Sequence, residues 1–214
     1  MAPYDRFQTI GWNIKAIGAL IVVFLIWLYL PLGVVGFIGF LYLCLLLHIP
    51  QRQLPVSLPQ DNDLIIAPID GRITHLDCND DHIIIDILCH VTSSQIVFAP
   101  LSGVIEDKLW IDGAYISADT AHFEMLSARQ EWVISHADGQ QVTLIQFAAT
   151  QTRYLTSALT TGQQVAMGEP FALGLMRSHI RLIVPSHYQL EIYEGQSCLA
   201  GESVLARDSR ATSP

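Results

Sequence analysis

The stretch that decides the fold is Ala67-Pro68-Ile69-Asp70-Gly71, which recurs 32 residues later as Ala99-Pro100-Leu101-Ser102-Gly103. A second pair of similar segments follows, Gly162–Glu169 and Gly195–Glu202, which are 33 residues apart. In each segment a glycine permits a turn that a side chain would block. These internal repeats indicate a region built from short strands and tight turns.

The rest of this region consists of short runs rich in β-branched residues and bounded by turn residues, a pattern that predicts strands. We expect strands at 64–67, 72–76, 82–88, 95–99, 104–110, 132–135, 141–148, 180–184 and 188–193. Only the segment Ala149–Ala158 has a sequence that suggests a helix. The repeated turns resemble the barrel-sandwich architecture of lipoyl and biotinyl carriers and of several decarboxylases, so we expect a mainly β, barrel-sandwich-like domain. A swinging-arm carrier is disfavoured because Lys108 does not lie at such a turn.

The N-terminal region is apolar, with no charged residue over the 32 positions from Ala16 to Leu47. A single helix of that length would reach about 48 Å, whereas the hydrocarbon core of a membrane is about 30 Å thick. Pro31 and Gly33 interrupt the run, which predicts a hydrophobic helical hairpin with helices at about 14–30 and 34–48. The alternatives are a cleaved signal peptide, for which the run is too long, and a hairpin buried in a protein core.

The chain is therefore expected to divide into a membrane-anchoring hairpin, a Pro-containing linker, a β domain and a flexible tail. The corresponding ranges are 1–49, 50–63, 64–206 and 207–214. Basic residues before and after the hairpin place both of its ends in the cytoplasm by the positive-inside rule. We expect the inner (cytoplasmic) membrane, with the C-terminal domain facing the cytoplasm.

Composition excludes several classes of function. Half of the chain (51%) is hydrophobic and 14% is charged, and the net charge is −9. Because no basic cluster exists, we expect no nucleic-acid partner. The four cysteines have neither close pairs nor metal-ligand spacing, which favours free thiols in a reducing compartment and no metal site.

The order of motifs resembles the short, membrane-anchored form of phosphatidylserine decarboxylase over residues 14–206. The resemblance rests on these segments, in order: Ile49–Arg52, Ala67–Ile73, Phe98–Gly103, Gly113-Ala114, Gln146–Arg153, Gly162–Gly168 and Gly174–Ser178.

This resemblance implies an electron sink for the carbanion that decarboxylation leaves. In the family a serine attacks the preceding carbonyl, the chain breaks, and the serine becomes a pyruvoyl group that forms a Schiff base with the substrate. An Asp–His pair activates the serine hydroxyl. The matching candidates here are Ser178 as the cleavage serine and Asp70 as the acid, with phosphatidylethanolamine as the product.

The chain departs from the family at these same points. The family has Gly-Ser at the cleavage point, whereas this chain has Arg177-Ser178, about two residues shorter. The family histidine position is occupied by Gln95, which is not a base near pH 7. The Asn-Glu-Arg signature has at best a relic in His122-Phe123-Glu124. Asp70 is kept, although an aspartate at such a turn is also a common turn former.

These departures favour an uncleaved, catalytically impaired protein without a cofactor, linked to phospholipid metabolism and binding a phospholipid or a partner. Arg153 and Arg177 are the candidates for holding a lipid phosphate. The alternative is an active enzyme that cleaves itself between Arg177 and Ser178, with His75, His90 or His179 replacing the missing base. A different enzyme or a carrier is the third possibility. Oligomeric state and partner enzyme are left open.

Overall fold

The computed structural model describes residues 3–46, 64–89, 96–116, 120, 122–136, 139–148, 155–157, 159–174 and 179–212. The chain forms two compact units, Met1–Pro50 and Gln51–Pro214.

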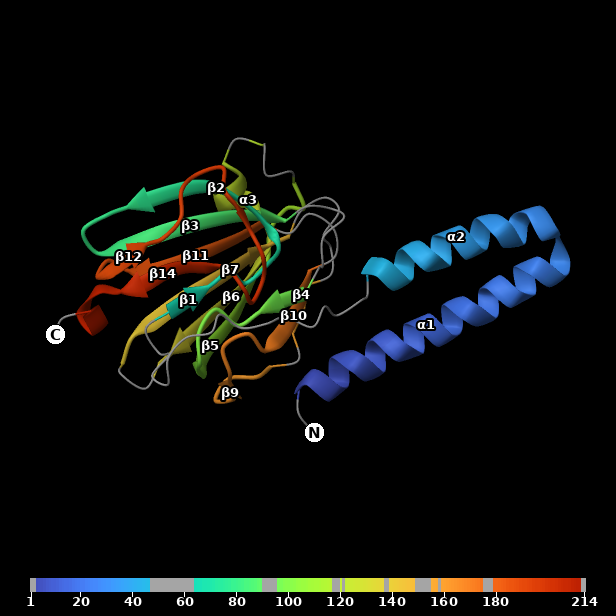
Figure 1. Ribbon diagram of the computed structural model, residues 1–214, viewed down its shortest axis with the longest axis horizontal. Coiled ribbons are helices and arrows are strands. Elements are labelled where there is room, and N and C mark those ends of the chain that lie inside the picture. Colours follow the sequence, from blue (N-terminus) through green and yellow to red (C-terminus); the bar gives the residue numbers. More distant parts are fainter. Residues whose placement is uncertain are drawn as a thin grey trace. The chain divides into compact units, whose positions relative to one another are not determined.

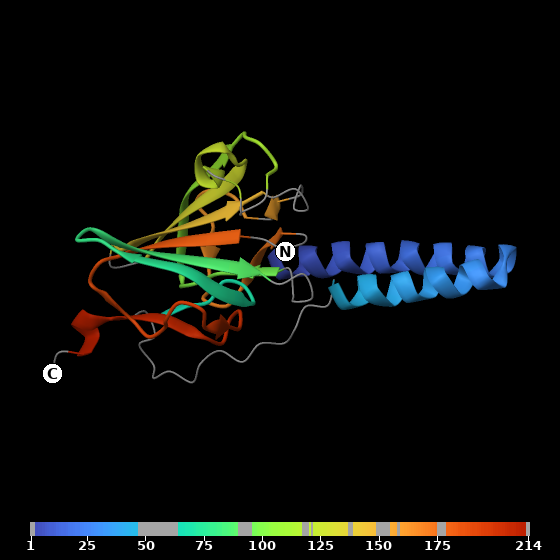
Figure 2. The same ribbon diagram turned by 90° about the horizontal axis from the view of Figure 1, so that it is seen from above.

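The N-terminal unit contains two helices, α1 (Pro3–Leu28) and α2 (Leu30–Leu46), which run side by side (Figure 2). A Cβ atom on Gly18 would lie 2.9 Å from the ring of Phe40, so the helices approach closely where α1 has no side chain. The helices separate at Tyr29 rather than at Pro31 and Gly33. Pro31 falls in the first turn of α2, where its missing N–H leaves no hydrogen bond unmade.

Among the described residues, neither helix is both long enough and apolar enough to cross a membrane. α2 has 17 residues, a rise of about 26 Å, and α1 carries Asp5, Arg6 and Lys15 in its first half. This finding does not support the transmembrane hairpin expected from the sequence.

The described part of the C-terminal unit consists of strands, one short helix and a final 3₁₀ turn. Its elements are β1 (Leu64–Ile66), β2 (Gly71–Cys78), β3 (His82–Cys89), β4 (Ile96–Phe98), β5 (Gly103–Ile111), α3 (Phe123–Leu126), β6 (Arg129–Ser135), β7 (Gln141–Phe147), β8 (Leu155–Ser157), β9 (Gln164–Val165), β10 (Pro170–Gly174), β11 (His179–Pro185), β12 (Tyr188–Leu190), β13 (Ser197–Cys198), β14 (Val204–Asp208) and η2 (Ser209–Thr212). The expected mainly β fold is confirmed.

The strands that the structure describes form one large and two small antiparallel sheets (Figure 1). The large sheet has the order β13-β2-β3-β11-β7-β6-β5-β9, and the small sheets are β1-β14-β12 and β4-β10-β8. Since β13 and β9 are the two edges of the large sheet, the described strand pairs do not close it into a barrel. The barrel-like closure expected from the sequence is thus not shown.

The three sheets are built from one strand arrangement used twice. β1, β2, β3, β11, β12, β13 and β14 form an outer half, and β4 to β10 form an inserted half with the same pairings in the same chain order. The inserted half lies between β3 and β11 of the outer half in the chain. β7 pairs with β11 and joins the halves at the centre of the large sheet.

The sequence repeats make equivalent contacts in the two halves. The N–H of Gly201 donates to the carbonyl of Ala67 in the outer half, and the N–H of Gly168 donates to that of Ala99 in the inserted half, both at 2.9 Å. Both glycines have φ of +74°, the left-handed region that other residues rarely adopt. Glycine is therefore required at the same point of each repeat.

The two Ala-Pro turns also bind each other. The N–H of Phe98 donates to the carbonyl of Pro68 at 2.8 Å, and the N–H of Ile66 donates to that of Pro100 at 3.0 Å. This exchange of hydrogen bonds ties each half to the other next to the catalytic-candidate residue Asp70.

The strand predictions agree with the structure for β1 to β7, β11 and β12. β8, β9, β10, β13 and β14 were not expected, because two to five residues carry too little periodicity to predict. In the segment Ala149–Ala158, for which the sequence suggests a helix, residues 155–157 form strand β8. The rest of that segment lies outside the described residues. β14 and η2 extend through residues 207–212, within the expected tail.

Candidate functional site

The chain segments that contain most of the candidate catalytic and lipid-binding residues are attached at one end of the large sheet. The register places Leu88, His179 and Phe147 side by side on β3, β11 and β7. Three segments outside the described residues are attached at this end: 90–95, 149–154 and 175–178. The topology therefore brings the attachment points of separate sequence motifs together.

Five residues that the sequence singles out lie outside the described residues: Gln95, His90, Arg153, Arg177 and Ser178. Ser178 is bonded directly to His179, the first residue of β11.

Asp70 lies in the turn before β2 and is buried. Its Oδ1 accepts a hydrogen bond from the N–H of Ala200 at 2.8 Å. The repeat position in the inserted half is Ser102, whose Oγ accepts from the N–H of Met167 at 2.9 Å. The Asp70 carboxylate and the Ser102 hydroxyl thus stabilise equivalent turns in the two halves. Asp70 therefore has a structural role that does not depend on catalysis.

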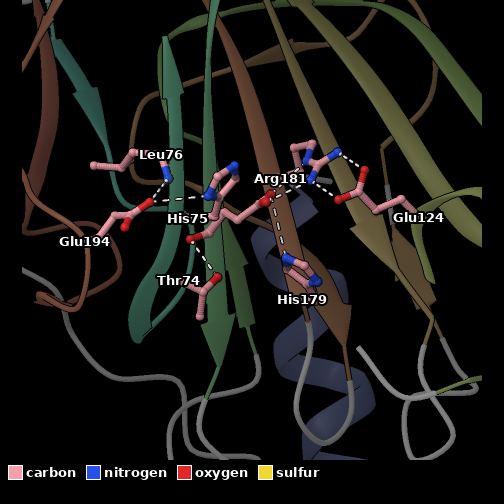
Figure 3. A network of polar contacts seen from close by, with 8 residues as sticks. Thr74, His75, Leu76, Glu124, His179, Arg181 and Glu194 are labelled. Atoms are coloured by element: carbon pink, nitrogen blue, oxygen red, sulfur yellow. Dashed lines mark hydrogen bonds and ion pairs between the residues drawn. The ribbon is translucent and has the colours of Figure 1, made fainter. Parts of the chain in front are cut away.

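Two of the candidate histidines occupy different environments. His75 is exposed on β2, where its Nδ1 lies 3.3 Å from Glu194 (Figure 3). His179 is largely buried, and its Nε2 lies 3.6 Å from Oδ1 of Asp86. Its ring stacks on that of Phe123, with centroids 5.5 Å apart. The residue that follows Ser178 in the chain, His179, therefore lies beside a carboxylate.

Asp86 and His179 belong to a network of polar contacts that also includes Arg181 and Glu124 (Figure 3). Arg181 on β11 makes two hydrogen bonds to Asp86 on β3, Nε to Oδ1 and Nη2 to Oδ2, both at 2.8 Å. The same guanidinium binds Glu124 on α3, with Nη1 2.5 Å from Oε2. Arg181 thus joins two neighbouring strands and the short helix.

The network keeps its acids charged. Burial raises the pKa of Asp86, but the hydrogen bonds from Arg181 and the nearby His179 outweigh this effect and lower it to about 2. The hydrogen bond from Arg181 also lowers the pKa of Glu124. Both carboxylates raise the pKa of Arg181, the hydrogen bond from Asp86 contributing most. Asp86, Glu124 and Arg181 are therefore ionised at neutral pH.

The sequence did not predict this network, although it carried a signal for it. Asp86 is the one charged residue in the apolar run Ile83–Leu88, and a charge in a buried strand requires a partner. The partner, Arg181, is 95 residues away in the chain. In the sequence, Glu124 stands out only as part of the segment His122-Phe123-Glu124.

Residues 47–206 match the phosphatidylserine decarboxylase family. The chain belongs to this family. It is 29% identical to the phosphatidylserine decarboxylase proenzyme of Nitrobacter winogradskyi over 198 residues, which cover 88% of this chain and 78% of the relative. It is 30% identical to the phosphatidylserine decarboxylase proenzyme of Ehrlichia chaffeensis over 156 residues, 69% of each chain.

Family membership was anticipated from the order of motifs and is confirmed. The matched range begins just after α2 and ends within β14, so it includes the sheet end described above. Among the described residues no group of three or more histidine, cysteine or acidic side chains is arranged to hold a metal ion.

Proposed function

We propose that this member of the phosphatidylserine decarboxylase family is a phospholipid-binding protein that does not cleave itself. The observation that carries the proposal is the residue at the position of the family base, Gln95. A glutamine cannot take the proton of a serine hydroxyl near pH 7. Without that step Ser178 does not attack the carbonyl of Arg177, and the chain stays intact.

The residue before the serine supports the same proposal. The family has a glycine there, and this chain has Arg177. A side chain restricts the backbone conformations available at the point of attack. Asp70, the acid that is kept, also stabilises the turn through Ala200, a task that a serine performs in the other half. Retention of Asp70 therefore does not require catalysis.

Phospholipid binding needs shape, hydrogen bonds and a cation, none of which depends on cleavage. We assign the lipid phosphate to Arg153 and Arg177, because guanidinium groups bind phosphate oxygens in a bidentate manner. Both belong to segments, 149–154 and 175–178, that are attached at the same end of the large sheet.

The cleavage test is an intact mass measurement of the purified full chain. An uncleaved protein gives one species of 23.8 kDa. A cleaved protein gives two, the smaller being residues 178–214, 37 residues with a blocked N-terminus. Two species would overturn the proposal that the chain stays intact.

The lipid test is pelleting with vesicles of neutral lipid containing phosphatidylserine. Arg153→Ala and Arg177→Ala are expected to weaken binding several-fold. Arg207→Ala is the matched control, because Arg207 is half-exposed and pairs with Glu191 elsewhere on the domain. Equal binding by all three variants would remove the proposed phosphate contacts.

One observation favours a second candidate function, an active decarboxylase. His179 lies beside Asp86 and directly follows Ser178, so an Asp–His pair is present next to the candidate nucleophile. A pyruvoyl group made from Ser178 would supply the electron sink for decarboxylation. Against this role, both oxygens of Asp86 are already hydrogen-bonded to Arg181. Cleavage in the mass measurement, abolished by His179→Gln, would establish this candidate.

We further propose that the helical unit holds the domain at the cytoplasmic face of the inner membrane. Large apolar side chains are exposed along both helices, among them Phe24, Trp27, Val35 and Ile38. A contiguous apolar surface of this kind is expected to contact lipid or another protein. Removal of residues 1–49 should release the protein from membranes in a flotation assay, and retention there would contradict this assignment.

A further inference from the structure

A group of exposed apolar side chains lies where α3 meets the end of β5. Met125 of α3 is 80% exposed, and Leu126 of α3, Trp110 of β5 and the nearby Tyr115 are 39–53% exposed. We call these four side chains the α3–β5 patch. Single exposed apolar residues are normal on a protein surface, whereas a contiguous patch of a few hundred Å² on a monomer is often functional. The patch therefore needs an explanation if its members adjoin one another.

Backbone contacts hold the two segments of the patch side by side. The N–H of Ala114 donates to the carbonyl of Leu126 at 2.7 Å, and the N–H of Ala128 donates to the carbonyl of Ala114 at 3.0 Å. Gly113 permits this approach, because a Cβ atom there would lie 2.5 Å from the N atom of Ala128. All four side chains of the patch are attached within four residues of these contacts along the chain, so they form one local surface.

Two polar groups that border the patch have partners within the domain. The indole N–H of Trp110 donates to Oδ1 of Asp112 at 2.6 Å. Glu124, the residue before Met125, binds the guanidinium of Arg181 at 2.5 Å. An apolar phase over the patch therefore meets paired polar groups, which costs less than covering unpaired ones.

The patch lies at the end of the large sheet described above. The register aligns Ile111, the last residue of β5, with Phe147 of β7 and His179 of β11. The Phe123 ring of α3 packs against the rings of Phe147 and His179, with centroids 5.2 and 5.5 Å apart. Both segments of the patch are thus connected through described residues to the sheet end to which the proposed function assigns the phospholipid.

The size of the patch favours a bilayer surface over a protein partner. A large aromatic side chain has roughly 150–250 Å² of surface, so the four partly exposed side chains present on the order of 400 Å². A specific protein interface buries about 800 Å² on each partner. The residue types agree with a bilayer, since tryptophan and tyrosine are enriched where an apolar phase meets water.

We propose that the α3–β5 patch is a membrane-docking surface, whose four side chains enter the interfacial region of a phospholipid bilayer. The inference rests on the phospholipid binding proposed above and deepens it, because a protein that binds a bilayer lipid has to meet the bilayer beside its binding site. The contact is apolar rather than electrostatic, since the chain carries a net charge of −9. It should therefore persist at high salt, which screens exposed charges.

A fluorescent probe on the full chain tests the docking surface. The background variant replaces Cys44 and Cys78 by serine, which leaves only the buried thiols of Cys89 and Cys198. A single new cysteine in this background is then labelled with a nitrobenzoxadiazole group, whose emission rises and shifts to the blue in an apolar environment.

Met125→Cys places the probe in the patch, and Leu199→Cys is the matched control. Leu199 is also exposed, and it follows β13, the edge of the large sheet opposite to the β5–β9 edge. We expect vesicles of phosphatidylcholine containing phosphatidylserine to raise the emission at position 125 several-fold, at low and at high salt. The emission at position 199 should change little.

The labelled variants should fold, because both substituted side chains are exposed, and an unchanged melting temperature checks this. Should Met125→Cys not fold, Leu126→Cys carries the probe instead, with the same expected gain. Equal gains in emission at the patch and at position 199 would show that the domain adsorbs without a preferred face, and would overturn the inference.

The other outcomes separate this inference from the proposed function. If the natural chain does not pellet with the vesicles, the proposed phospholipid binding itself fails. If the labelled chain pellets with them and the patch probe does not respond, the docking surface alone is overturned. A patch probe that responds to protein concentration in the absence of vesicles would identify a contact between two copies of the chain, which also overturns the inference.

Discussion

Replacing Arg181 by methionine tests the network that joins β3, β11 and α3. Methionine keeps much of the length and removes the charge, leaving the Asp86 carboxylate buried without the partner that holds both of its oxygens. With Arg181 present, the pKa of Asp86 is about 2, against its usual 3.8, although burial alone would raise it. At about 1.4 kcal/mol per pKa unit, the charged form is favoured in the folded state by about 2 kcal/mol.

The expected loss at pH 7 is larger than this figure, about 3–5 kcal/mol, because an unpaired buried charge is left behind. Denaturant unfolding of the full chain, followed by circular dichroism, measures it. The double variant Asp86→Leu with Arg181→Met should recover most of the loss, because an apolar pair then fills the space. Glu124→Gln should cost under about 1 kcal/mol, since the Glu124 side chain is 53% exposed.

The pH dependence has a definite sign. Because the folded-state pKa of Asp86 is lowered, its contribution is complete above the ordinary carboxylate pKa and is lost as the pH falls through about 2. The difference between natural chain and Arg181→Met should therefore be largest near neutrality and shrink in acid. An equal difference at pH 7 and pH 3, or a cost for Glu124→Gln as large as that for Arg181→Met, would refute the reasoning.

Three further predictions concern the repeats and the buried thiol. Gly71→Ala should destabilise the fold by more than about 1 kcal/mol in denaturant unfolding, because the new Cβ would lie 2.5 Å from the carbonyl oxygen of Leu88; a neutral effect would show that the strands can separate there. Ser102→Ala should cost about 1 kcal/mol by removing the acceptor that holds its turn, and an unchanged melting temperature would contradict that role. Burial raises the pKa of the Cys198 thiol to about 11, so at pH 8 a maleimide should modify the exposed Cys78 and leave Cys198 unmodified in the folded protein, as read by mass spectrometry; rapid labelling of Cys198 would mean that β13 opens readily.

The repeated turns were predictable from the sequence because their requirements are local. A glycine with positive φ, a proline and an aspartate or serine act within a few residues, so their recurrence is visible in the linear chain. The long strands were predictable for the same reason, since β3 and β11 carry continuous β-branched patterns. The order of motifs sufficed to identify the family.

What the sequence could not reveal is how the two halves are joined. The inserted half separates β3 from β11 by 89 residues of chain, from 90 to 178, yet the two strands are paired in register. The pairing of β3 with β11 decides which residues lie opposite one another, and no local sequence pattern encodes that pairing.

Asp86 and Gln146 show the consequence for function. From the sequence alone, one is a charge in an apolar run and the other a polar residue in a strand. The tertiary structure gives Asp86 a partner from β11 and leaves Gln146 buried without one among the described residues. Local chemistry thus determined the turns, strands and family of this protein. Long-range strand pairing decided which polar groups are paired, because hydrogen bonding depends on neighbours in space.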